Sequence, residues 1–255
     1  MNPATAVLEA RGLVKRFGSR TVVKGVNLRV GAGEIAGLLG RNGAGKTTTF
    51  QMIVGLLRPD AGSIALEGRD VSRMPTDKRA LAGLTYLPQE NSVFLKATVA
   101  DNLRLGLELR GYGRAERKAA ASKLLEEFGL ADLARQPAHT LSGGERRRLE
   151  IARALILKPK FLLLDEPFTG IDPLTILELQ QVLLRLKAHG IGIVLSDHNV
   201  RDTFKIADRA CIIDEGEILI DDVPLKVAAD AIARERFLGK TFAFGEEREE
   251  ERRRR

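Results

Sequence analysis

The stretch "EIAGLLGRNGAGKTTTF", Glu34 to Phe50, decides the fold of this chain. Its first part, "EIAGLLG", is a short apolar run bounded by glycines, which is typical of a buried strand. Beyond it, apolar residues recur at helical spacing, at Phe50, Ile53, Val54 and Leu57. The segment therefore predicts a strand, a glycine-rich loop and a helix in direct succession.

The loop between strand and helix matches the phosphate-binding pattern G-x-x-x-x-G-K-[ST], over 40–47. Its glycines let backbone N–H groups wrap the phosphates, while Lys46 neutralises the β- and γ-phosphates and the Thr47 hydroxyl ligates Mg²⁺. The alternative is a glycine-rich turn with no ligand. We expect the loop and its continuation to hold ATP through Gly40, Arg41, Asn42, Gly43, Ala44, Gly45, Lys46, Thr47 and Thr48.

Two carboxylates follow a second apolar strand, in "FLLLDEP". Asp165 is placed to hold Mg²⁺, directly or through water. Glu166 is placed to act on the water that attacks the γ-phosphate. The alternative is a strand-ending turn with both carboxylates solvated. Beside a matched phosphate loop, the pair predicts the metal and general-base groups of a phosphohydrolase.

A second candidate anion site is "LSGGERRRLEIARAL", Leu141 to Leu155. Ser142 and Glu145 form a capping box, which predicts a helix start. Two consecutive glycines lower helix stability there, and close approach of a ligand explains them. The charges after the glycines have a spacing that fits either an exposed charged helix face or a specific role, with Glu150 near Arg146 and Arg153.

Composition limits the class of protein. The 255 residues include 41 basic and 34 acidic side chains, a net charge of +7 that fits partners carrying phosphate. The low aromatic content, 5% with no Trp, disfavours a base-stacking nucleic-acid surface. A lone Cys211 excludes an internal disulfide and indicates a reducing compartment. The opening residues do not resemble a signal peptide and the apolar runs are short, so we expect a cytoplasmic protein.

The order of patterns predicts the domain organisation. Alternating β-type runs with frequent turns come first, and a segment with 3.6-residue periodicity and no strand covers about 98–133. From Phe161 onward, strands and helices alternate, which favours a parallel sheet covered by helices. We expect one α/β domain over 1–240, with a helical subdomain inserted at about 95–155. The charged stretch over 241–255 should be disordered.

These motifs together resemble the ATP-binding subunits of ABC transporters, from Phe17 to about Asp222. The resemblance implies a P-loop ABC ATPase with a RecA-like, mostly parallel sheet core and an N-terminal antiparallel β region. It also implies a homodimer, a second copy of this chain closing over two ATP molecules. The "LSGGE" segment would then face the ATP of the partner, through Ser142, Gly143, Gly144 and Glu145.

Further site residues carry over from the same resemblance. Phe17 matches the aromatic that stacks on adenine, unless it is an ordinary core side chain. Gln89 in "YLPQE" would touch Mg²⁺ or the lytic water, and Asp172 in "GIDP" would reach across the dimer interface. His198 in "LSDHNV" would bind the γ-phosphate. The expected catalytic set is Glu166, His198, Lys46 and Gln89, and the expected Mg²⁺ set is Thr47, Gln89 and Asp165.

The longer strings around these motifs resemble the ATPases that drive lipopolysaccharide export. This implies two transmembrane permease subunits as partners, docking near Gln89 and Phe94, and a place on the cytoplasmic face of the inner membrane. Phe94 could instead pack inside its own subunit. Branched-chain amino-acid importers use ATPases of similar pattern, so that cargo is the alternative. A soluble ABC ATPase acting on nucleic acid is disfavoured, because such proteins usually carry two ATPase modules.

Overall fold

A computed structural model describes residues 6–239, 241, 242 and 244 of the chain. Its centre is a six-stranded sheet in which every neighbouring pair is parallel except the pair at one edge. Across the sheet, the strands are β10 (Glu217–Asp222), β9 (Arg209–Asp214), β3 (Ile35–Leu39), β8 (Gly192–Asp197), β7 (Phe161–Asp165) and β6 (Leu84–Leu87). The mostly parallel α/β core expected from the sequence is confirmed.

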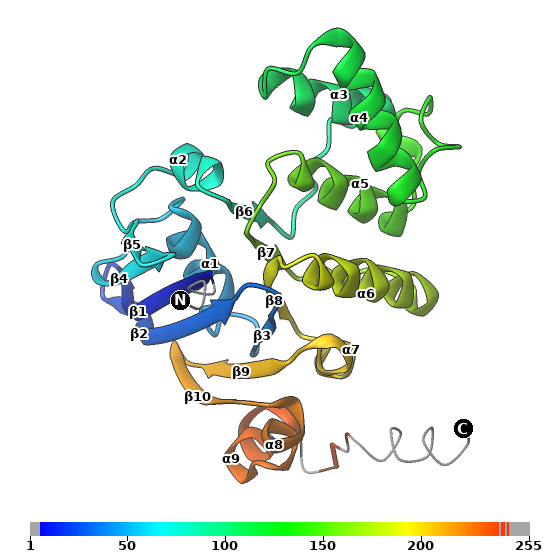
Figure 1. Ribbon diagram of the computed structural model, residues 1–255. Helices are drawn as coiled ribbons and strands as arrows, with labels where there is room; N and C mark the ends of the chain where they lie inside the picture. The colour runs from blue at the N-terminus through cyan, green and yellow to red at the C-terminus, as the bar shows by residue number, and fades with distance from the viewer. Residues whose placement is uncertain (1–5, 240, 243, 245–255) are drawn as a thin grey trace, which may run out of the picture.

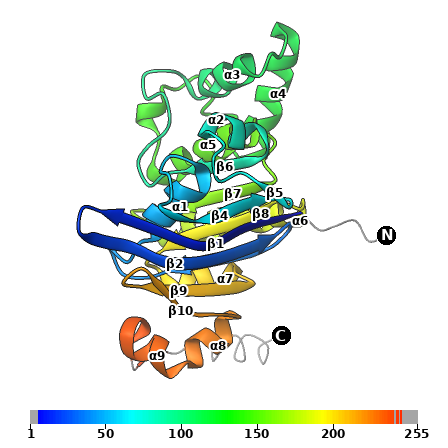
Figure 2. The same ribbon diagram turned by 90° about the vertical axis from the view of Figure 1, so that its left-hand side faces the viewer.

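A second, antiparallel sheet forms the N-terminal region. Its strands, in spatial order, are β2 (Arg20–Gly31), β1 (Val7–Phe17), β4 (Ala61–Leu66) and β5 (Arg69–Asp70). Figure 2 shows the long β1 and β2 ribbons running across the strands of the central sheet. This confirms the antiparallel β region expected at the start of the chain.

Alternate residues of the central strands enter different cores, as the two-residue period of a strand requires. On β7, Leu162 and Leu164 join one cluster, and Phe161 and Leu163 join the other. The first cluster contains the inward faces of α6 (Pro173–Ala188) and the helical subdomain. The second contains the antiparallel sheet and α1 (Lys46–Val54). Burial on both faces explains why these strands are uniformly apolar in sequence.

The helical subdomain lies to one side of the sheets in Figure 1. Its elements are α3 (Val99–Leu109), α4 (Arg114–Glu127), a 3₁₀ turn (Ala138–Thr140) and α5 (Gly143–Leu155). Another helix, α2 (Thr76–Leu81), connects the antiparallel sheet to β6.

The chain continues past the sheet as a short C-terminal helical group. It consists of α8 (Pro224–Ala229), α9 (Ala231–Ala233) and a π-helical turn (Arg234–Leu238), and it shares a small core with α7 (Val200–Ile206), the helix between β8 and β9. Phe204 of α7 lies edge-on to Phe242 and Phe244 at centroid distances of 6.0 and 5.1 Å. Of the stretch predicted to be disordered, 241–255, all but 241, 242 and 244 lies outside the described residues, so this expectation stays a prediction. Within the described part, every helix is too short or too polar to span a bilayer.

Candidate functional site

Four of the sequence motifs follow strands that end at the same edge of the central sheet. Leu39 of β3 is paired with Asp197 of β8, and Ser196 of β8 is paired with Asp165 of β7. The phosphate loop, Glu166 and His198 continue directly from these strands, and Gln89 follows β6 two residues after its end. Ligands of open α/β sheets bind outside the carboxyl ends of the strands. The candidate site therefore lies where this fold predicts a ligand.

The phosphate loop has the backbone shape that its glycines permit. Gly43 and Gly45 have φ angles of 80° and 110°, which other residues rarely adopt. A Cβ on Gly40 would lie 2.2 Å from the Ile213 carbonyl oxygen, so the loop also needs glycine for packing. Beside it is a cavity of about 270 Å³ lined by Val22, Asn42, Gly43, Gly45, Lys46, Thr47, Thr48, Gln89 and Glu166.

Lys46 is the buried cation of this site. It is 5% exposed, and its Nζ donates to the carbonyl oxygens of Gly40 at 2.8 Å and Arg41 at 3.1 Å. Burial lowers the pKa of Lys46, while the negative charges of Glu166 and Asp165 oppose that shift. A lysine held by two neutral carbonyl oxygens can exchange them for phosphate oxygens, which are charged and therefore stronger acceptors.

Asp165 is held by two hydroxyl groups. Its Oδ1 accepts a hydrogen bond from the Ser196 hydroxyl, and its Oδ2 accepts one from the Tyr86 hydroxyl at 3.1 Å. The carboxylate is 1% exposed. Burial and the adjacent Asp165 charge raise the pKa of Tyr86 well above its usual value, so Tyr86 stays a neutral donor.

Glu166 is the point at which three motifs meet. Its Oε2 accepts hydrogen bonds from Gln89 Nε2 and Thr169 Oγ1, both at 3.0 Å, and lies 3.5 Å from Nδ1 of His198. Its φ of 47° is left-handed, and its N–H donates to the Ser196 carbonyl at 2.9 Å. A non-glycine residue in this region marks a constrained position, and such positions cluster at functional sites.

Asp197 supports the segments on both sides of His198. Its carboxylate is fully buried and accepts N–H bonds from Phe168 at 3.1 Å and Asn199 at 2.8 Å. Burial raises the pKa of Asp197, and the two backbone donors oppose that shift. His198 itself is half exposed, 3.7 Å from the same carboxylate.

The capping box expected at the start of α5 is present. Ser142 Oγ accepts from the Glu145 N–H at 3.3 Å, and Glu145 Oε2 accepts from the Ser142 N–H at 2.8 Å. For Gly144 the structure supplies a reason other than a ligand, because a Cβ there would lie 1.9 Å from Cγ2 of Thr175 on α6. Gly143 is exposed, and a Cβ there would have one near neighbour, the Gly170 carbonyl oxygen, at an ordinary contact distance of 3.6 Å. Packing thus explains the second glycine but not the first.

We predict that Gly144→Ala destabilises the protein by about 1–3 kcal/mol, the usual cost of overpacking. Thr175→Ser should rescue much of this loss, because it removes Cγ2 but keeps the hydroxyl that donates to Asp172 at 2.6 Å. Gly143→Ala is the matched control and should not destabilise, since alanine favours a helix. Urea unfolding of the wild type, Gly144→Ala, Gly144→Ala/Thr175→Ser and Gly143→Ala measures these effects. A Gly144→Ala chain as stable as the control would contradict the packing argument.

The arginine-rich part of α5 contradicts the first of its two sequence interpretations, an exposed charged helix face with Glu150 near Arg146 and Arg153. Glu150 is 3% exposed and its carboxylate pairs with Arg147 at 2.7 Å. Arg147 also donates to the carbonyls of Pro88 and Asp165, both at 3.1 Å. The expectation failed because burial of this helix face comes from the Gln89 loop, which the periodicity of α5 alone does not reveal.

Arg147→Met should cost about 3–5 kcal/mol of unfolding free energy, because it leaves the Glu150 carboxylate buried without its cation. Arg148→Met is the control, since its partner Glu178 is half exposed and such pairs contribute about 1 kcal/mol or less. Thermal and urea unfolding give both values. Equal losses of unfolding free energy in the two variants would show that the buried Arg147–Glu150 pair stabilises the protein no more than the exposed Arg148–Glu178 pair.

The structure brings together some predicted site residues and leaves others apart. The loop residues Lys46 and Thr47 line the same cavity as Gln89 and Glu166. No residue of the segment 142–145 lines that cavity, and neither do Asp172 and Phe17. Asp172 instead caps α6, accepting from the Thr175 N–H at 3.0 Å.

Phe17 is 51% exposed, which contradicts its alternative as a core side chain. Sequence reasoning did not find the hydroxyl groups on Asp165, from Tyr86 and Ser196, or the buried Asp197. In the sequence, only their positions beside the motifs point to them. Tyr86 lies three residues before Gln89, and Ser196 and Asp197 come directly before His198.

This glycine cradle, buried lysine and pair of strand-end carboxylates define a P-loop nucleoside triphosphatase. The model of the ABC transporter family matches residues 23–169. The chain belongs to this family, whose ATP-binding cassettes are ATPases, and it is an ATP-binding, ATP-hydrolysing subunit.

Known proteins similar to this chain agree with that assignment. The lipopolysaccharide export system ATP-binding protein LptB of Acidithiobacillus ferridurans is 48% identical over 92% of this chain and 98% of its own length. The protein of the same name from Escherichia coli K12 is 44% identical over 93% and 99%. A crystal structure of an ABC transporter cassette in its ADP conformation, 26% identical, superposes with a TM-score of 0.83 over 92% of this chain and 99% of that chain.

Proposed function

We propose that this chain is the ATPase motor of a lipopolysaccharide exporter, working as a homodimer that encloses two MgATP molecules. The observation that carries the dimer is the separation of the two anion-binding segments. The cavity at the phosphate loop contains Lys46, Gln89 and Glu166 but no residue of 142–145. An exposed helix N-terminus at Ser142 would then complete the site of a second copy.

The residues at the cavity fit a triphosphate and a divalent cation. The loop offers backbone N–H groups, the buried ammonium of Lys46 and the hydroxyl of Thr47, while Asp165 and Gln89 supply oxygens at the same edge. These oxygen donors suit Mg²⁺. Mg²⁺ bound here would neutralise charge on the phosphate oxygens. Thr47, Gln89 and Asp165 are the groups that would hold it.

The catalytic proposal centres on the carboxylate of Glu166. Its oxygen already accepts from Gln89 and Thr169, so the side chain is oriented before substrate arrives. In that orientation it accepts a proton from the attacking water, and Gln89 positions the same water. His198, close to Glu166, donates to the γ-phosphate, and Lys46 stabilises the charge that develops on it. Phe17, exposed at the end of β1, stacks on the adenine.

The second copy supplies the remaining groups. The first N–H groups of α5, at Gly143, Gly144 and Glu145, have no partner within a helix and carry its positive dipole end. Together with the Ser142 hydroxyl they would face the partner's γ-phosphate. Asp172, at the N-terminus of the adjacent α6, would reach across the same interface.

Membrane partners are proposed to dock beside the Gln89 loop, which places the chain on the cytoplasmic face of the inner membrane. Phe94 and Leu95 are 51% and 42% exposed there, and large exposed apolar side chains mark interaction surfaces. The Arg153 guanidinium lies 4.8 Å from the Phe94 ring centroid and donates to the Ser92 carbonyl, which fixes the ring in its exposed position. Two transmembrane permease subunits would each seat an apolar side chain on this surface.

The cargo is inferred from the relatives named LptB, which match nearly the full length of this chain. The test is to tag the chain in its native cell, crosslink lightly, solubilise the membranes and identify the co-purifying proteins by mass spectrometry. Two membrane proteins with large periplasmic domains are expected. A branched-chain amino-acid permease pair would move the cargo to the alternative, and nucleic-acid or ribosomal proteins alone would contradict the transporter function.

A further inference from the structure

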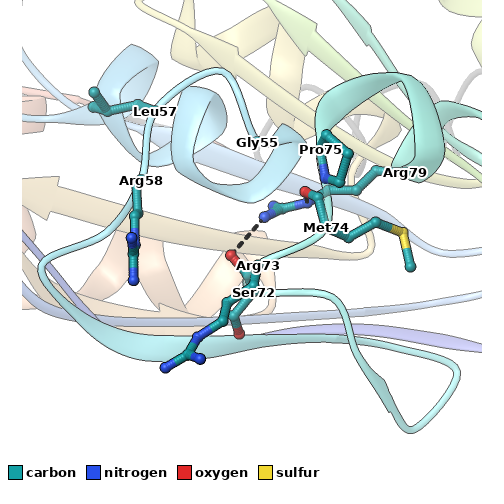
Figure 3. Close-up of a pocket in the computed structure, with 8 residues that line it drawn as sticks. All are labelled: Gly55, Leu57, Arg58, Ser72, Arg73, Met74, Pro75 and Arg79. Carbon is teal, nitrogen blue, oxygen red and sulfur yellow. Dashed lines mark hydrogen bonds between the residues drawn. The ribbon is translucent and has the colours of Figure 1, made fainter.

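Three arginines surround a cavity at the far end of α1 from the phosphate loop. The cavity has a volume of about 330 Å³ and is lined by Gly55, Leu57, Arg58, Ser72, Arg73, Met74, Pro75 and Arg79. In Figure 3 the Arg58 and Arg73 side chains both extend downward, and the Arg79 guanidinium lies above Arg73 with a hydrogen bond to the Ser72 carbonyl. The nucleotide site and this cavity share no lining residue.

Arg79 makes the cavity a built site rather than a surface depression. Its side chain is 2% exposed, and Nη1 donates to the carbonyls of Met52 at 2.9 Å and Ile53 at 2.5 Å, in the last turn of α1. Nε donates to Met74 at 2.8 Å and Nη2 to Ser72 at 2.9 Å. Four carbonyls therefore hold the guanidinium in place, one fewer than its five N–H donors. Carbonyl oxygens orient this cation without neutralising it.

The positive charge around the cavity is not balanced within the described residues. No ion pair of Arg58, Arg73 or Arg79 with a carboxylate is found there. The acid that most affects Arg79 is Asp70, which already accepts from the Ser72 N–H at 2.8 Å and the Ser72 hydroxyl at 2.5 Å. The positive charges of Arg73 and Arg79 thus act on a carboxylate that is already bonded to Ser72. Such a site attracts a multiply charged anion.

We propose that this cavity binds a phosphate group. Phosphate carries close to two negative charges and several acceptor oxygens, and planar guanidinium groups pair with it in a bidentate manner. A carboxylate would bring one charge and two oxygens to three cations. The phosphate comes from a phosphomonoester headgroup of a membrane lipid or from a soluble phosphate compound. Leu56 lies between Gly55 and Leu57, which line the cavity, and Leu81 lies two residues after Arg79; these leucines are 59% and 58% exposed, which suits contact with lipid.

The test compares the wild-type chain with Arg58→Gln/Arg73→Gln, both exposed positions whose loss leaves the fold and basal ATPase activity intact. The control is Arg110→Gln/Arg135→Gln, two exposed arginines elsewhere with the same change in charge. The phosphate loop is first saturated with MgADP. Inorganic phosphate and acetate are then titrated by calorimetry, and phosphatidylcholine vesicles with or without phosphatidic acid, a lipid with a phosphomonoester headgroup, are tested by co-sedimentation.

The proposal predicts phosphate binding by the wild type and the control, with a roughly 25-fold loss in Arg58→Gln/Arg73→Gln, about fivefold for each arginine. Sedimentation with vesicles that contain phosphatidic acid and that follows the same pattern identifies the lipid source, and phosphate binding without vesicle binding identifies the soluble source. Equal binding by both double variants, no binding by the wild type, or acetate binding as tight as phosphate would each overturn it. ATP hydrolysis, measured in parallel, separates this result from any failure of the proposed transport function.

Discussion

Glu166→Gln should bind MgATP normally but hydrolyse it about 10²- to 10⁴-fold more slowly, the range of contribution from a positioned general base. Glutamine keeps the size of the side chain and an oxygen that can accept from Gln89 and Thr169, so the site geometry is preserved. It cannot accept the proton of the attacking water. Bound ATP therefore persists, and the proposed homodimer should accumulate.

Steady-state phosphate release and size-exclusion chromatography with light scattering measure the two effects. Glu178→Gln is a suitable control, because Glu178 is an exposed glutamate on α6 that pairs with Arg148 outside the cavity. It should hydrolyse ATP at the wild-type rate. A Glu166→Gln chain that stayed monomeric at saturating MgATP would contradict the sandwich, and one that kept its turnover would remove Glu166 from catalysis.

Ser142→Arg should reduce hydrolysis by at least about 10²-fold while leaving ATP affinity of the isolated chain nearly unchanged. The substitution puts a large side chain where the partner's γ-phosphate would approach the helix N-terminus. In the chain's own nucleotide cavity nothing changes, because Ser142 does not line it. A loss confined to turnover thus separates a role in the partner's site from a role in the same chain.

Fluorescent ATP binding and phosphate release distinguish these possibilities. The control is Ser142→Asp, which also caps a helix but places a negative charge toward the phosphate. It should fold as well as the wild type and hydrolyse poorly. Weakened ATP binding by the isolated Ser142→Arg chain would instead assign the segment to its own nucleotide.

Most of the fold follows from local patterns. The loop at 40–47 requires a strand before it and a helix after it, and β3 and α1 have those positions. Uniformly apolar strands such as β7 predict a sheet covered on both faces, which is observed. The pairing order of the strands does not follow from local patterns, because β3 lies between β8 and β9, and the paired residues are 158 residues apart in sequence for β8 and 173 for β9. Only tertiary contacts fix such an order.

The site residues also divide into those that local patterns predict and those that depend on long-range contacts. Gln89, Glu166 and Lys46 could be placed together because each motif continues a parallel strand at one edge. Gly144 was assigned to a ligand, whereas its neighbour Thr175 lies on another helix and is invisible to a local pattern. Arg147 was missed for the same reason: its partners outside α5 are carbonyls at Pro88 and Asp165. Long-range side-chain contacts are what the sequence patterns do not contain.

The most direct test of the homodimer is a cross-link between its two anion-binding segments. Asn42 and Ser142 are both exposed, so each is replaced by cysteine in the Glu166→Gln chain. The native Cys211 is fully buried, and burial raises its thiol pKa well above the usual value, which keeps it unreactive. With MgATP and a short bismaleimide, the account predicts a covalent product of twice the chain mass that neither single-cysteine chain forms alone. A cross-link within one chain, or no MgATP-dependent doubling of mass, would contradict it.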